Sequence, residues 1–180
     1  MLTIRSRHIH LREVDQGHFL QLYEWRIQSD FIGRCTLRGM VTFDEFCREI
    51  ATDLMTDRHE QLIIETPRSG RSIGTIYAYG GSPATQDVLI SAYVDPRFQG
   101  RGYGVYAAVA YAQHLFMLRG VKRLHMDVYS CNTEVLNILH QIGATAESFA
   151  DRVSVAEHYS REVRRFVFAD EQAVKLSRFL

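Results

Sequence analysis

A glycine-rich segment between an apolar strand and an apolar helix constrains this sequence more than any other feature. Val88–Val94 predicts the strand and Tyr103–Arg119 the helix, and Gln99-Gly100-Arg101-Gly102-Tyr103-Gly104 connects the two. Glycine at every second position lets the main chain approach a ligand, because no Cβ atoms stand in the way. The start of a helix offers unpaired N–H groups and the positive end of a dipole. The segment therefore predicts a seat for phosphates, to which Arg101 can add a charge-assisted contact.

Two other kinds of phosphate loop fit this segment less well. A Walker loop needs a lysine after its last glycine, and here Val105 follows Gly104. A dinucleotide-binding fingerprint needs a third glycine at position 105, and it normally lies in the first strand–helix–strand unit. A plain glycine-rich turn into a buried helix stays as the alternative interpretation.

The order of the remaining elements predicts an α/β fold. Thr42-Phe43-Asp44-Glu45 is a capping box that opens a helix, and Gly120 and Gly143 are expected to end two later helices. Because strands and helices are interspersed over the 180 residues, we expect one domain over residues 1–180, with a mixed sheet of about seven strands and helices on both faces. The third strand is expected to break at Gly80-Gly81-Ser82-Pro83. The predicted strands are His8–Glu13, Gln61–Glu65, Ser72–Tyr79, Val88–Val94, Leu124–Tyr129, Ala144–Val153 and Val163–Ala169.

Composition excludes several classes of function. A formal net charge of zero argues against a nucleic-acid binder that relies on bulk attraction to phosphate. Cys35, Cys47 and Cys131 form no C-x-x-C pair, which favours free thiols in a reducing compartment, and the histidines form no metal-binding motif. No signal peptide is evident, and the longest apolar stretch, Val105–Leu118, is too short to span a bilayer. We therefore expect a cytoplasmic protein with no metal, no nucleic-acid partner and no membrane contact.

The glycine-rich segment also resembles a known motif. Gln99 to Gly104 looks like the Q/R-x-x-G-x-G/A motif of GNAT acyltransferases, and Val94-Asp95-Pro96 resembles the end of that family's fourth strand. The element order over His8–Ala169 is similar too, and the length and N-terminal half look most similar to the branch that acetylates ribosomal-protein N-termini. The resemblance implies a sheet splayed between its fourth and fifth strands, with acetyl-CoA or another acyl-CoA as co-substrate. It also implies transfer to a primary amine of a peptide N-terminus, a polyamine or a small molecule, and a homodimer as a family-level expectation.

The same resemblance implies which residues hold the cofactor. The loop amides and the helix start would bind the diphosphate of coenzyme A, and the pantetheine arm would pair like an extra strand with the end of the fourth strand. An asparagine after the fifth strand would contact the pantetheine region. The cofactor-binding residues implied in this way are Ala92, Tyr93, Val94, Gln99, Gly100, Arg101, Gly102, Tyr103, Gly104, Val105 and Asn132.

The catalytic positions depart from the family pattern. Asp127 falls where some members carry a glutamate base, and it is one methylene shorter, so it would act through a water molecule. Its alternative role is a strand carboxylate in an ion pair, and Asn132 can serve as a helix N-cap. The family's tyrosine acid is replaced by Leu139, and a serine typical of the related branch by Val135. Substitutes for the acid, by chemistry alone, are Tyr103, Tyr129, Cys131 and His140.

Two classes of function follow. The first is an acyl-CoA-dependent N-acyltransferase, and the second is a binding module that holds an acyl-CoA without turnover. The missing tyrosine and serine give the second some weight. We favour the first, because the attack can proceed by proximity and carbonyl polarisation with modest acid help. The acceptor pocket is expected between the first two helices and the C-terminal hairpin, with Glu24, Trp25, Asp30, Phe31, His158 and Tyr159 as candidates.

Overall fold

A single mixed sheet organises the protein. The computed structural model describes residues 2–28, 41–55, 60–82, 86–141, 143–155 and 159–169. In these residues eight strands pair in the order β1-β2-β3-β4-β5-β6-β8-β7, and every neighbouring pair is antiparallel except β5 and β6. The strands are β1 (Thr3–Arg5), β2 (His10–Glu13), β3 (Glu60–Glu65), β4 (Ser72–Ser82), β5 (Asp87–Val94), β6 (Arg123–Tyr129), β7 (Thr145–Val155) and β8 (Tyr159–Ala169).

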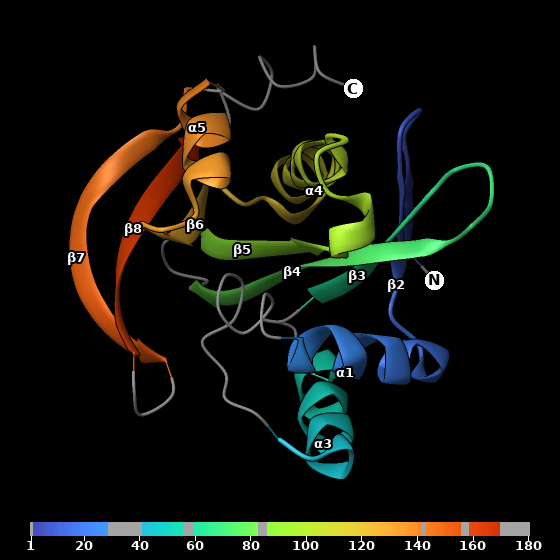
Figure 1. Cartoon of the computed structure of the whole chain (residues 1–180). Coiled ribbons are helices and arrows are strands. Elements are labelled where there is room, and N and C mark those ends of the chain that lie inside the picture. Colours follow the sequence, from blue (N-terminus) through green and yellow to red (C-terminus); the bar gives the residue numbers. More distant parts are fainter. Residues whose placement is uncertain are drawn as a thin grey trace.

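Helices cover both faces of this sheet, as the sequence predicts (Figure 1). Helices α4 (Tyr103–Arg119) and α5 (Thr133–Gln141) lie on one face, and α1 (Phe19–Ile27) and α3 (Phe43–Leu54) lie on the other. Helix α3 begins with the predicted capping box, and Gly120 and Gly143 adopt the left-handed conformation that ends a helix. In the described part of the chain, no helix combines the length and apolar character needed to cross a bilayer.

Each face of the sheet has its own hydrophobic core. Helix α4 is buried over most of its surface, and its alanines allow it to lie close to the central strands. The core beneath α1 and α3 is smaller, and its fully buried centre is Trp25. The residues buried there are Leu22, Trp25, Phe46, Ile50, Ile63 and Tyr93.

The two parallel strands separate after a short paired segment. Asp87, Val88 and Leu89 of β5 pair with the first three residues of β6, and the pairing ends at Leu89 and His125. Strand β5 stays paired with β4 as far as Val94, and β6 stays paired with β8 as far as Tyr129. The sheet is therefore open between β5 and β6, at the place predicted from the resemblance.

Two sequence predictions about strands need correction. The strand expected over His8–Glu13 begins at His10 and is β2, because residues 6–9 form a tight turn closed by Ser6. The Ser6 N–H donates to the Ile9 carbonyl, and the Ser6 hydroxyl accepts from the Ile9 N–H. This turn adds β1 to the sheet and gives eight strands where about seven were expected. The break expected at Gly80 is also wrong, because β4 continues to Ser82 through a register irregularity after Tyr79.

Gly74 lies close against the main chain of β5, and we predict that Gly74→Ala destabilises the fold. A Cβ atom there would lie 2.2 Å from the main-chain oxygen of Tyr93, so one strand must move. We expect a loss of roughly 1–3 kcal/mol in the free energy of unfolding, measured by urea denaturation. Gly70→Asn is the control, because Gly70 has a φ of +61° with no atom near its Cβ position, and asparagine tolerates that conformation. Equal stability of the two variants would contradict the close approach.

Candidate functional site

A cavity of about 520 Å³ lies where β5 and β6 separate. The glycine-rich loop and the start of α4 line its mouth, and apolar side chains of β5, β6, α4 and α5 line its interior. It brings together most of the residues singled out in the sequence, although Arg101 is exposed and lies outside the lining. Those lining the cavity are Ala92, Tyr93, Val94, Gln99, Gly100, Gly102, Tyr103, Gly104, Val105, Asp127 and Asn132.

The loop at the mouth depends on glycine in two places. Gly100 and Gly102 have φ angles of 72° and 78°, in the left-handed region that costs a residue with a Cβ atom energy. Gly102 is the N-cap residue of α4, so the helix begins directly after it. The loop backbone thus turns in two left-handed steps into the helix start.

The first turn of α4 is suited to an anion. No acidic residue lies in this turn, so the positive end of the helix dipole is not neutralised there. Its first N–H groups have no acceptor within the helix. The Cβ position of Gly104 is 3.5 Å from a methyl group of Val94, which leaves the helix start close against the end of β5. A phosphate at this point would meet main-chain donors and no acidic side chain of that turn.

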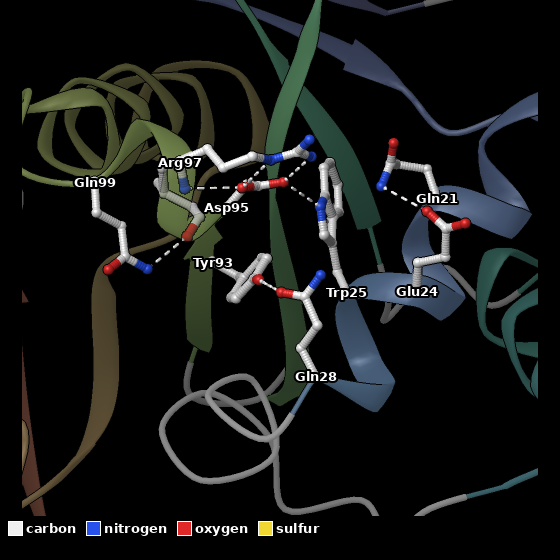
Figure 2. A network of polar contacts seen from close by, with 9 residues as sticks. Gln21, Glu24, Trp25, Gln28, Tyr93, Asp95, Arg97 and Gln99 are labelled. Carbon is white, nitrogen blue, oxygen red and sulfur yellow. Dashed lines mark hydrogen bonds and ion pairs between the residues drawn. The ribbon is translucent and has the colours of Figure 1, made fainter.

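A buried carboxylate attaches this loop to the opposite face of the sheet (Figure 2). Asp95 is 2% exposed, and its two oxygens accept from the indole of Trp25 at 3.0 Å, from the Arg97 main-chain N–H at 2.9 Å and from the Arg97 guanidinium at 3.0 and 2.6 Å. The Arg97 side-chain hydrogen bonds lower the pKa of the Asp95 carboxyl to about 2, although its burial acts in the opposite direction. Asp95 also caps the short 3₁₀ helix η2 (Pro96–Phe98).

Two further contacts of the same network hold the end of β5 (Figure 2). The Tyr93 hydroxyl donates to the side-chain carbonyl of Gln28 at 2.7 Å, and the Gln99 side-chain amide donates to the Val94 carbonyl at 2.8 Å. Gln99 therefore ties the glycine-rich loop back to the strand from which it departs. This hydrogen bond gives the Gln99 side chain a structural role and does not test its predicted role in cofactor binding.

Asp127 lies on β6 beside the opening and is part of an ion pair. The guanidinium of Arg165 on β8 donates to its two oxygens at 2.7 and 2.8 Å, and the side chains are 15% and 24% exposed. The carboxylate raises the pKa of the Arg165 guanidinium through this hydrogen bonding. Of the two roles considered for Asp127, the structure displays the ion pair.

Two tyrosines of β4 belong to the surroundings of this ion pair. Tyr77 and Tyr79 share one face of the strand, and their ring centroids are 5.5 Å apart. Burial raises the pKa of the Tyr79 hydroxyl, and the neighbouring Tyr77 and Asp127 add to the effect while Arg165 opposes it. Tyr79 therefore stays protonated at neutral pH, so its hydroxyl can donate a hydrogen bond.

The candidate acids occupy different places. Tyr103 lines the cavity, Tyr129 is buried, and Cys131 and His140 are exposed. At the position of the family's tyrosine acid, the buried side chain of Leu139 lines the cavity. Among these four side chains, Tyr103 alone lies at the cavity wall.

The residues expected to receive the acceptor fall into three groups. Trp25 is a packing residue that holds Asp95, whereas Glu24 is exposed and accepts a hydrogen bond from Gln21. Tyr159 begins β8. Asp30, Phe31 and His158 lie outside the described residues.

Cysteine and metal chemistry contribute little to the described site. Cys47 is half-buried beside the core under α1 and α3, Cys131 is exposed, and neither is part of a disulfide. Cys35 lies outside the described residues. Within the parts of the chain that the structure describes, no group of three His, Cys, Asp or Glu residues is arranged to hold a metal ion.

Sequence reasoning missed three features of this site. Arg165 is 38 residues from Asp127, and the two meet only because β6 and β8 pair in that register. The contact between Asp95 and Trp25 spans 70 residues and carries no local pattern. The pairing of Tyr77 with Tyr79 could have been predicted from the sequence, because alternate residues of a strand point to the same face.

Comparisons with known proteins agree on one family. A family model described as an acetyltransferase (GNAT) domain matches residues 8–145. A search of curated proteins by sequence gave no match. Among solved structures, spermidine N-acetyltransferase from Vibrio cholerae superposes with a TM-score of 0.85 at 12% identity, covering 94% of this chain and 99% of its own.

Two other solved structures are similar at the same level. A ribosomal L7/L12 alpha-N-protein acetyltransferase has a TM-score of 0.81 at 14% identity, covering 93% of this chain and 94% of its own. A GCN5-related N-acetyltransferase from Brucella melitensis has a TM-score of 0.79 at 18% identity, covering 98% of this chain and 82% of its own. At these identities the structures share the fold, and no single branch of the family is distinguished.

We predict that Asp95→Asn lowers stability in a pH-dependent manner. The pKa of this carboxyl is about 2 in the folded chain and about 4 in an unfolded one, so its contribution is present above pH 4 and is lost as the pH falls toward 2. We expect the variant to lose about 2 kcal/mol at pH 7, and less below pH 4, in urea denaturation at a series of pH values. Asp44→Asn, at an exposed position, is the matched control. A deficit that stays the same down to pH 2.5 would show that the charge of Asp95 is not what stabilises the fold.

Proposed function

Because the chain belongs to the GNAT family of acetyltransferases, we propose that it transfers an acyl group, with acetyl as the family donor, from coenzyme A to a primary amine. The observation that carries the proposal is the cavity that joins the glycine-rich loop to the open side of β5. The family uses acetyl-CoA, and one structural neighbour was solved with CoA and spermine and another with CoA.

The donor would enter at the loop. The left-handed glycines and the first turn of α4 supply main-chain donors and a positive dipole for a diphosphate. The side of β5 that no longer pairs with β6 supplies main-chain groups for the amides of the pantetheine arm, in the manner of an added strand. Asn132, whose carbonyl accepts the first hydrogen bond of α5, stands at the opposite wall. We assign cofactor binding to these residues on this basis.

Transfer would take place in the opening between the strands. The amine nitrogen attacks the thioester carbonyl, a C–N bond replaces the C–S bond, and the amine proton is lost while the departing sulfur gains one. We assign Asp127 to the removal of the amine proton through a water molecule, since Asp127 lines the cavity and both of its oxygens already accept from Arg165. A main-chain N–H near Val94 would polarise the carbonyl.

The acceptor would approach from the face that carries Asp127, Tyr79 and Arg165. Structural neighbours are named for spermidine and for a ribosomal protein N-terminus, so the acceptor class we propose is a primary amine of a polyamine, a peptide or a small molecule. The half-buried Tyr79 hydroxyl and the ion pair offer both hydrogen-bond donors and acceptors on that side.

One observation favours a second candidate, an acyl-CoA-binding module without turnover. Leu139 places an apolar side chain where the resemblance puts the acid. Release of free thiol in the presence of an amine and peptide panel separates the two candidates. Thiol release with any amine supports the enzyme, and binding of acetyl-CoA without release supports the module.

We predict that Gly104→Val weakens acetyl-CoA binding at least tenfold. The added side chain would stand among the main-chain donors at the start of α4, while valine can still adopt the helical conformation. Binding is measured by calorimetry, and the melting temperature of the variant shows that it is folded. Ala146→Val, at an exposed strand position, is the control and should bind like wild type. Unaltered affinity in a folded Gly104→Val variant would contradict the assigned donor site.

A double-mutant cycle tests Asp127. If Asp127 removes the amine proton, Asp127→Asn should lower amine-dependent thiol release by roughly a hundredfold or more while acetyl-CoA binding stays nearly intact. Arg165→Gln alone should cost less, because it leaves the carboxylate in place. The double variant has no unpaired charge, so a loss due only to the broken ion pair should be reversed in it.

The double variant distinguishes a role of Asp127 in proton removal from a role as ion-pair partner alone. A double variant as inactive as Asp127→Asn supports the assigned role in proton removal. Recovery of activity in the double variant would show that Asp127 serves only as the partner of Arg165.

A further inference from the structure

The hairpin of β1 and β2 contacts the start of α4 through a pair of stacked rings. The imidazole of His8, in the turn between the two strands, lies 4.2 Å from the Tyr106 ring, centroid to centroid, with an angle of 13° between the two planes. Tyr106 belongs to the N-terminal part of α4, and the hairpin lies beside that helix (Figure 1). The stack therefore connects the edge of the sheet to the helix that begins at the glycine-rich loop.

Tyr106 packs in turn against Gly102, the N-cap residue of α4. A Cβ atom at Gly102 would lie 3.2 Å from a carbon of the Tyr106 ring, and the Tyr106 N–H donates to the Gly102 carbonyl at 3.0 Å. Residues at this spacing face each other on a helix surface. Glycine has no side chain of its own to pack, so the Tyr106 ring restricts a position that would otherwise be free to turn.

His8 is itself held by the turn in which it lies. Its main-chain N–H donates to the Ser6 hydroxyl at 3.3 Å, and the same hydroxyl accepts from the Ile9 N–H at 3.1 Å. The Ile9 side chain is fully buried in the core on the α4 side of the sheet. A movement of His8 away from Tyr106 would therefore disturb both this hydrogen-bonded turn and a core residue.

We propose that His8 and Tyr106 are positioning residues for the glycine-rich loop, and that their stack prepares the loop to bind the diphosphate of coenzyme A. This step rests on the proposed function, in which main-chain donors of the loop and of the first turn of α4 hold that diphosphate. Neither ring belongs to the described residues that line the cavity, so each would act on the cofactor through Gly102. A loop that is ordered before the ligand arrives binds more tightly, because less conformational entropy is lost on binding.

The first test is whether removal of the stack weakens only those donors that carry a diphosphate. His8→Ala should lower acetyl-CoA affinity by roughly three- to tenfold, the size of effect typical of an aromatic pair. S-acetylpantetheine carries the same thioester without the diphosphate, so its affinity should stay at the wild-type value. Titrations followed by NMR measure both, since they extend to weak binding, and the melting temperature shows that the variant is folded. Equal losses for the two donors, or no loss for either, would overturn the proposal.

Two variants of the same hairpin are matched controls. His8→Phe keeps an aromatic ring that can stack on Tyr106, and it should bind acetyl-CoA like wild type. His10→Ala removes a half-buried imidazole of β2 that has no stacking partner in the described part of the chain, and it should also bind like wild type. A loss in His8→Phe as large as that in His8→Ala would contradict the stack, because it would mean that an imidazole nitrogen is required.

A double-mutant cycle tests whether His8 acts through Tyr106. Tyr106→Leu removes the ring and should lower acetyl-CoA affinity at least as much as His8→Ala does. In the Tyr106→Leu background, His8→Ala should cause no further loss. A further loss of full size would show that His8 reaches the cofactor directly and would overturn the positioning role. Failure of the wild-type chain to bind acetyl-CoA would instead overturn the proposed function itself.

Discussion

The separation of β5 from β6 is the constraint on which the rest of the site depends. Two parallel strands that begin in register would ordinarily continue to pair, because unpaired main-chain groups are costly to bury. Here each strand is held from its outer side. The Asp127–Arg165 ion pair ties β6 to β8, and the Asp95 network ties the end of β5 to α1. The gap between them is thereby kept as a cavity instead of closing into a continuous ladder.

Asp95 gives this arrangement a further consequence, because one carboxylate serves both faces of the sheet. It caps η2, which leads into the glycine-rich loop, and it accepts from Trp25 in the core beneath α1. A shift of α1 would therefore move the glycine-rich loop through the buried Asp95 carboxylate alone. The low pKa of Asp95 keeps that group charged throughout the neutral range, so the connection does not depend on pH near 7.

Local chemistry explains what could be predicted from the sequence. The glycine-rich loop, the capping box at Thr42 and the left-handed helix ends at Gly120 and Gly143 all depend on residues within a few positions of one another. The cavity brings together ten of the eleven residues expected to bind the cofactor. Contacts between residues distant in the chain could not be predicted from local patterns. Arg165 is an example, because it meets Asp127 only through the register in which β6 pairs with β8. The first strand was misjudged because the turn after Ser6 contains neither glycine nor proline.

Leu139 is an apolar residue at the position where the resemblance implies an acid. The resemblance places an acidic hydroxyl at this position, and a hydroxyl among Leu124, Val109 and Phe168 would need a hydrogen-bond partner that these side chains cannot provide. An apolar residue removes that need. A thiol leaves readily, and positioning alone can supply a large part of a rate enhancement. With Leu139 in this place, a transfer reaction would depend on positioning and on the ease with which the thiol leaves.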